Sequence, residues 1–177
     1  MRKNLVMTLT GPDRVGIVDR IAQLILEFDG NIEESRMARL GGEFSMLILL
    51  TAPEAKFEAL RERLQDLSNE GFKVSTGQTN RGHSVRFAGW IPYRLTVNGA
   101  DHEGIVYHLA HFLAEQGIHI EQMDTSMVRA PMSGTPLFVM SAIVLVPPDL
   151  PQHGWRDELG DIGDKMNVDI DISPYAG

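Results

Sequence analysis

The sequence contains two copies of one unit, and this repeat limits the fold more than any other feature. Residues 8–33 align without a gap on residues 96–121, at an offset of 88 residues (96 − 8) in a chain of 177. The alignment keeps glycines and apolar side chains in register, so that Gly-Ile-Val at 16–18 falls on Gly-Ile-Val at 104–106. Solenoid architectures need at least three repeats to bury a continuous core. Two copies therefore predict a tandem pair of domains.

The spacing of apolar residues in each copy predicts the order strand, helix, hairpin, helix, strand. In the first copy, residues 5–9 alternate as in a strand, and apolar positions between 17 and 28 recur at helical spacing. Gly41-Gly42 separates two further strands, because glycine adopts the positive φ values that a tight hairpin requires. The sequence therefore predicts an α+β fold of two tandem ferredoxin-like βαββαβ domains. Each would have an antiparallel four-stranded sheet with two helices on one face.

A polar segment separates the two copies. Residues 77–89 contain glycine, lack hydrophobic periodicity and resemble a loop in composition. We therefore predict a first domain at 1–80, a linker at 81–89 and a second domain at 90–177. The last helix of the second domain contains Gly160 and Gly163, which are expected to weaken it by up to about 1 kcal/mol each relative to alanine.

Charge and composition exclude several classes of protein. The chain has 16 Lys plus Arg and 24 Asp plus Glu, a net charge of −8. The residues after position 88 carry this whole excess, with 4 basic and 12 acidic side chains. An acidic chain is a poor direct binder of nucleic acid, and the acidic half is either a solvated surface or a docking face for a basic partner.

The cysteine count and the apolar segments indicate the compartment. The chain has no cysteine, which excludes a disulfide scaffold and a thiol nucleophile. Its apolar runs are too short for a membrane helix of about 20 residues, and the N-terminus lacks the apolar core of a signal peptide. These features predict a cytoplasmic protein with no membrane association.

The most informative motif is a corner between strand and helix that occurs in both copies. It reads GPDRVGIV at 11–18 and GADHEGIV at 99–106. The second glycine would let a ligand approach the main chain, and the first helical turn favours a carboxylate or another anion. Asp13 and Asp101 fall where a helix N-cap is wanted, so capping alone is an alternative explanation for them.

These motifs resemble ACT domains, which are small βαββαβ modules that bind amino acids and regulate enzymes or transcription. The resemblance includes GNI at 30–32 and EQGIHI at 115–120, and it covers about residues 3–79 and 90–173. The tandem arrangement without a catalytic domain, together with SGTPLF at 133–138, is similar to the glycine cleavage system transcriptional repressor family.

The resemblance implies a ligand at an interface between paired domains, held by the corner of one and the opening of the second strand of the other. The implied ligand-binding residues are Gly11, Asp13, Arg14, Val15, Gly16, Ile17, Asn31 and Ile32 in the first copy, and Gly99, Asp101, His102, Gly104, Ile105, His119 and Ile120 in the second. The Asn31 amide would read an amino group and a carboxylate, and His119 would titrate near neutrality. If only one corner binds a ligand, the basic side chain of Arg14 favours the corner of the first copy. The alternative is that Arg14 is only a solvated surface charge.

Other chemistries find less support in the sequence. His108 and His111 share a helix face, but zinc needs three or four converging ligands. No nucleophile or nucleotide-binding motif is present, and the strands that would stack on RNA are aliphatic. We therefore expect no metal and no cofactor.

The sequence favours a non-catalytic regulator that senses a small amino acid, such as glycine, and controls transcription through a protein partner, with a homodimer as one arrangement. Its alternatives are a constitutive protein–protein adaptor with vestigial ligand sites and a small ferredoxin-like enzyme that uses the histidines of the second half.

Overall fold

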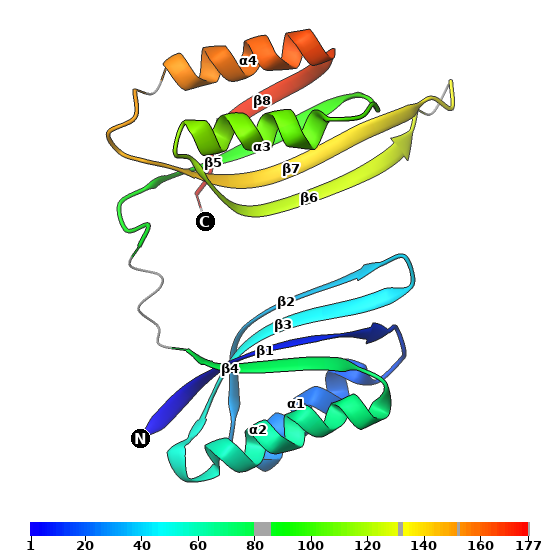
Figure 1. Ribbon diagram of the computed structural model, residues 1–177, viewed down its shortest axis with the longest axis vertical. Helices are drawn as coiled ribbons and strands as arrows, with labels where there is room; N and C mark the ends of the chain where they lie inside the picture. The colour runs from blue at the N-terminus through cyan, green and yellow to red at the C-terminus, as the bar shows by residue number, and fades with distance from the viewer. Residues whose placement is uncertain (80–85, 131–132, 152, 177) are drawn as a thin grey trace. The chain divides into compact units, whose positions relative to one another are not determined.

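The computed structural model describes residues 1–79, 86–130, 133–151 and 153–176 (Figure 1). The chain divides into two compact units, Met1–Ser84 (unit 1) and Val85–Gly177 (unit 2). Residues 81–85 of the predicted linker lie outside the described residues, and residues 86–89 form a turn before the first strand of unit 2.

Unit 1 follows the predicted order. Its elements are β1 (Arg2–Pro12), α1 (Ile17–Glu27), β2 (Asn31–Leu40), β3 (Glu43–Pro53), α2 (Phe57–Gln65) and β4 (Lys73–Thr79), with short 3₁₀ segments η1 (Glu54–Lys56) and η2 (Asp66–Glu70) flanking α2. The four strands form an antiparallel sheet in the order β2-β3-β1-β4.

Unit 2 repeats this architecture. Its elements are β5 (Ile91–Ala100), α3 (Ile105–Glu115), β6 (His119–Arg129), β7 (Pro136–Val146), α4 (Gly154–Met166) and β8 (Val168–Pro174). The sheet order is β6-β7-β5-β8, again fully antiparallel. The predicted α+β fold of two βαββαβ domains is confirmed.

Each core lies between one face of the sheet and its two helices (Figure 1). In β1 the inward side chains of Leu5, Met7 and Leu9 are fully buried, because alternate residues of a strand face the same side. The buried face of α1 begins with Ile17 and Ile21, at the spacing that the sequence predicts.

Two local features fix the edges of the sheets. The β2–β3 hairpin turns at Gly41 and Gly42, with φ values of 59° and 88°, as a tight primed turn requires. The edge strands β2 and β6 each carry a bulge, at Glu33 and at Glu121, where the register with the neighbouring strand shifts by one residue. The β6–β7 loop is longer, and its residues 131 and 132 lie outside the described part of the chain.

The two glycines of α4 differ in their surroundings. A Cβ on Gly163 would lie 2.9 Å from the carbonyl oxygen of Val168 and 3.0 Å from the side chain of Ile170, whereas a Cβ on Gly160 would meet nothing within 4 Å. Gly163 therefore allows α4 to pack closely on β8. Close packing explains why a glycine stands at position 163 although it weakens the helix, and it does not explain the glycine at position 160.

Candidate functional site

The corners before α1 and α3 start their helices with a left-handed glycine. Gly16 has φ 89° and Gly104 has φ 94°, and the helices begin at Ile17 and Ile105. No side chain caps either helix N-terminus. The first N–H groups of a helix have no partner within the helix, so these termini can receive an anion.

The capping role considered for the two aspartates is wrong. The N-cap position belongs to the glycine three residues later, because the chain turns through the left-handed region before the helix begins. Asp13 instead donates its backbone N–H to the carbonyl of Gly42 at 3.3 Å, and its carboxylate pairs with Arg39 at 3.4 Å. The backbone N–H of Asp101 donates in the same way to the carbonyl of Pro136, at 3.4 Å.

Gly11 and Gly99 are required by close packing. A Cβ on Gly11 would lie 2.6 Å from Cδ1 of Phe72, and one on Gly99 would lie 2.6 Å from Cγ1 of Val168. Phe72 and Val168 each follow the last helical segment of their unit. The two contacts show that Phe72 of unit 1 corresponds to Val168 of unit 2.

A cavity of about 170 Å³ opens at the corner of unit 1. Its walls come from β1, the corner, α1, η2 and the residue before β4. The lining residues are Leu9, Arg14, Val15, Gly16, Ile17, Arg20, Ile21, Leu67, Glu70 and Phe72. Leu9, Ile21 and Leu67 are buried and make one wall apolar. Four of the predicted site residues, from Arg14 to Ile17, thus line one cavity.

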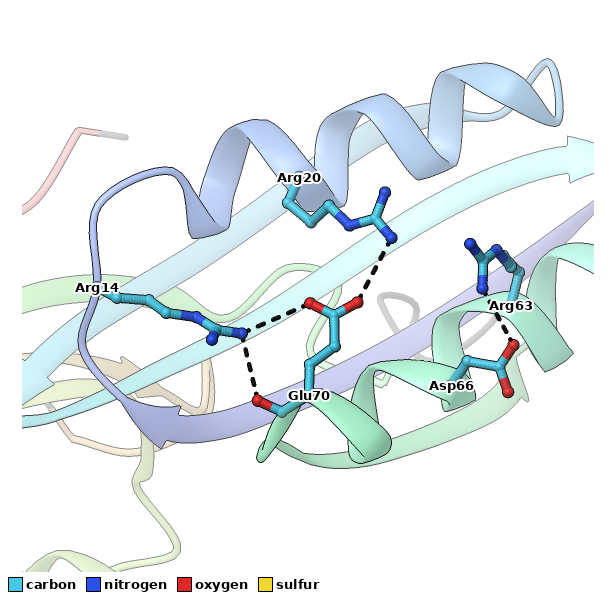
Figure 2. Close-up of polar contacts among 5 residues, drawn as sticks. All are labelled: Arg14, Arg20, Arg63, Asp66 and Glu70. Carbon is cyan, nitrogen blue, oxygen red and sulfur yellow. Dashed lines mark hydrogen bonds and ion pairs between the residues drawn. The ribbon is translucent and has the colours of Figure 1, made fainter.

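Three charged side chains surround this cavity, and we call them the Arg–Glu–Arg cluster: Arg14, Glu70 and Arg20. Figure 2 shows both arginines pointing toward the Glu70 carboxylate, Arg14 from the corner and Arg20 from α1. Nη2 of Arg14 lies 3.5 Å from Oε2 of Glu70, and Nη2 of Arg20 lies 3.4 Å from Oε1. Arg14 also donates to the Glu70 carbonyl at 3.3 Å, and its guanidinium lies 4.4 Å from the ring centroid of Phe72.

The equivalent corner of unit 2 has different chemistry. His102 takes the place of Arg14, His108 that of Arg20, and Met166 that of Glu70, by the repeat offset and the correspondence of Phe72 with Val168. Nε2 of His102 lies 2.7 Å from the carbonyl oxygen of Met166, as Arg14 lies against the Glu70 carbonyl. The corner contact with the backbone is therefore kept, and the carboxylate is replaced by a thioether.

The pKa of His102 is raised above its ordinary value. The first cause is the hydrogen bond to the Met166 carbonyl, and the second is the contact of Nδ1 with the Glu103 carbonyl at 3.1 Å. Neutral imidazole has one N–H and the imidazolium has two. Because both ring nitrogens face carbonyl oxygens, the protonated ring satisfies this site better than the neutral one.

The first residues of β2 and of β6, which are the predicted second-strand openings, lie far from the corner of their own unit. Asn31 pairs with Thr51, which pairs with Asn4 near the start of β1, whereas Gly11 lies at the other end of that strand. His119 of β6 is placed in the same way in unit 2. Within one unit the structure does not bring corner and opening together, so a site that uses both needs a second domain.

The side chains at these openings already have partners. Asn31 donates to the Glu33 carboxylate at 3.2 Å. His119 stacks on Phe87 with ring centroids 4.1 Å apart and lies 3.4 Å from the Glu121 carboxylate. Ile32 and Ile120 are half-buried against their cores.

Across the described ranges, no group of three or more His, Asp or Glu side chains converges as a metal site would require. Within the same ranges, no helix combines the length and the apolar character needed to cross a membrane.

Comparison with known proteins identifies the fold family. The family model of the ACT domain matches residues 3–75, from β1 into β4. A crystal structure of an unknown protein from Galdieria sulphuraria is 31% identical, covers 99% of this chain and 100% of that one, and has a TM-score of 0.86. Unit 1 belongs to the ACT domain family. Unit 2 has the same topology as unit 1, so the chain is a tandem ACT-domain protein.

Two further matches are to proteins described as glycine cleavage system transcriptional repressors. The glycine cleavage system transcriptional repressor of Escherichia coli K12 is 47% identical over 47 residues, which are 27% of this chain and 25% of that protein. The match thus spans about a quarter of that relative's length. A crystal structure of a candidate glycine cleavage system transcriptional repressor covers 100% of this chain and 99% of that one, with a TM-score of 0.71 and 19% identity, a likeness that shows the fold.

Proposed function

We propose that this tandem ACT protein is a non-catalytic cytoplasmic regulator that binds a small amino acid and controls transcription through a protein partner. The observation that carries the proposal is the corner of unit 1. There an uncapped helix N-terminus and two arginines face a cavity of about 170 Å³. Helix N-termini and arginine are the groups that proteins use to bind carboxylates.

The ligand would act by changing the population of conformations. A molecule in the cavity would contact α1, η2 and the corner at the same time, and it would favour arrangements in which these segments are held together. A ligand shifts such an equilibrium only by its difference in affinity for the two states. The surface offered to a partner would change with that shift.

Control of transcription through a partner is supported by the similarity to the E. coli repressor and by charge. The chain carries a net charge of −8, which opposes contact with the phosphates of DNA. The purified chain alone is therefore expected not to retard DNA fragments in a gel. Retardation at physiological salt by the chain alone would contradict indirect control.

Thermal unfolding in the presence of each of the twenty amino acids tests the sensing role. A ligand at 100 times its Kd adds about 2.7 kcal/mol to the free energy of unfolding. At roughly 2–4 °C per kcal/mol for a chain of this size, the expected rise in Tm is about 5–10 °C. A rise with one or a few amino acids supports a sensor, and a flat panel supports the adaptor function in its place.

A further inference from the structure

We infer that the Arg–Glu–Arg cluster of unit 1 is a recognition site for the α-carboxylate and α-ammonium of a free, small amino acid, contained within a single ACT domain. This inference rests on the proposed function and names the groups that would perform it. It locates binding at Arg14, Arg20 and Glu70, without a contribution from the second-strand openings.

The ion pairs of the cluster are easily exchanged. Their N–O distances are 3.4 and 3.5 Å, and the side chains are 37 to 49% exposed. Such exposed pairs contribute little to stability. An incoming carboxylate could therefore replace Glu70 as the partner of an arginine with little loss of free energy. Arginine binds carboxylates with two parallel hydrogen bonds.

The position of Glu70 favours an amino acid over a simple carboxylate. A carboxylate bound between Arg14 and Arg20 would lie next to the Glu70 carboxylate, and two like charges at that distance repel. An ammonium on the adjacent carbon of the ligand removes this repulsion, because it pairs with Glu70. A molecule with both charges thus satisfies all three side chains.

The cavity also suits a small ligand side chain. A cavity of about 150 Å³ in an engineered protein holds benzene, which has six heavy atoms. The cavity of about 170 Å³ found here is of similar size. Its wall of Leu9, Ile21 and Leu67 offers no polar partner, and a polar group buried there without a hydrogen bond would be unfavourable. Glycine and L-alanine suit a cavity of this size with this apolar wall.

Arg14 is held ready for this role. Its guanidinium lies 4.4 Å from the Phe72 ring centroid and donates to the backbone carbonyl of Glu70. One N–H group of the guanidinium therefore holds the Arg14 side chain in place. Other N–H groups remain for a ligand, since a guanidinium has five. Unit 2 has no carboxylate at this place, because Met166 stands there.

The test measures the rise in Tm of the full chain with glycine and L-alanine, and the affinity of each by calorimetry. We expect Arg20→Gln and Glu70→Gln to weaken binding of the active amino acid at least tenfold. Acetate, which lacks the ammonium, and glycinamide, which lacks the carboxylate, are expected to cause no shift in the wild-type chain. Circular dichroism and the Tm without ligand establish that each variant is folded, and Arg20→Lys and Glu70→Asp provide milder changes.

Arg63 and Asp66 supply matched controls. They form an ion pair at 3.3 Å on α2 and η2, outside the residues that line the cavity (Figure 2). Arg63→Gln and Asp66→Asn remove the same charges without touching the cluster, so they should leave binding unchanged.

The outcomes separate the inference from the proposed function. If an amino acid binds wild type and the Arg20 and Glu70 variants equally well, the inference is overturned and the sensing role stands, with Asn31 as the next residue to change. If acetate binds as tightly as glycine, the cavity binds anions in general, and recognition of the ammonium by Glu70 is ruled out. If no amino acid binds wild type, both proposals fail together.

Discussion

Arg14 and His102 occupy equivalent places in the two units, and this single difference gives the two corners different responses to pH. Both side chains contact the backbone carbonyl of the residue that ends the last helical segment of their unit. Arginine stays cationic at every accessible pH, whereas histidine gains and loses its proton near neutrality. The backbone contact of His102 is therefore sensitive to pH near neutrality, whereas that of an arginine is not.

Removal of the His102 imidazole should flatten the pH dependence of unit 2 stability. Since the pKa of His102 is raised in the folded state by its bonds to the Met166 and Glu103 carbonyls, its contribution is complete below about pH 6.5, the ordinary value. It is then lost as the pH rises through the folded value. The difference in urea midpoint between wild type and His102→Gln should be largest near pH 6 and smaller at about pH 8.5.

His153→Gln is the control for that comparison, because His153 is exposed and precedes α4. A difference for His102→Gln that grows with rising pH would contradict the two-carbonyl arrangement.

The residues of the candidate site were only partly predictable from the sequence. Arg14 could be identified because it lies inside the repeated corner. Glu70 could not, because it is 56 residues from Arg14 in the chain and only the packing of η2 beside α1 brings the two together. Arg20 carried a weak signal, since it lies one helical turn after Gly16, but helical arginines are commonly solvated.

At the level of helices and strands, the repeat made prediction effective. Each element could be checked against its copy, and core positions such as Ile17 and Ile105 recur at the same offset. The start of α1 at Ile17 agrees with the apolar spacing, whereas the alternative of an aspartate N-cap fails because the left-handed turn at Gly16 places the N-cap three residues after Asp13. Local propensity alone does not reveal such a turn.

The contrast between the two glycines of α4 gives a prediction for this helix. Gly160→Ala should raise the free energy of unfolding by about 0.5–1 kcal/mol, because alanine is the better helix former and the space is open. Gly163→Ala should lower it by about 1–3 kcal/mol, because its Cβ would press on Val168 and Ile170.

Tryptophan fluorescence during urea unfolding measures both changes. The two tryptophans, Trp90 and Trp155, lie in unit 2, and Trp155 is buried in its core. The signal therefore follows the unit that contains α4. Equal effects of the two alanines would show that α4 does not depend on close approach to β8.

Over the whole molecule, one backbone plan carries two different sets of side chains. The sheets and corners of the two units match, while the charged cluster of unit 1 is replaced by histidines and a methionine in unit 2. The acidic excess also falls entirely after residue 88. The units are thus alike in fold and unlike in the charge and chemistry of their side chains.

Titration calorimetry with the active amino acid should accordingly give one site per chain. Among the described residues the cluster occurs once, and Met166 cannot pair with an ammonium as Glu70 can. Two equal sites per chain would show that backbone N–H groups at both corners suffice. In that case Glu70→Gln would lower the affinity of neither site.

The bulges of β2 and β6 affect the behaviour of the protein at high concentration. An edge strand exposes unpaired N–H and C=O groups that can recruit a strand from another molecule and extend the sheet. Here each of these edges is interrupted close to its first residue, and a glutamate, Glu33 or Glu121, occupies the additional position. A recruited strand would meet an irregularity and a carboxylate at the beginning of either edge, and regular pairing would be limited to the residues after the bulge. Growth of either sheet into fibrils would therefore be hindered at this end of the edge strand.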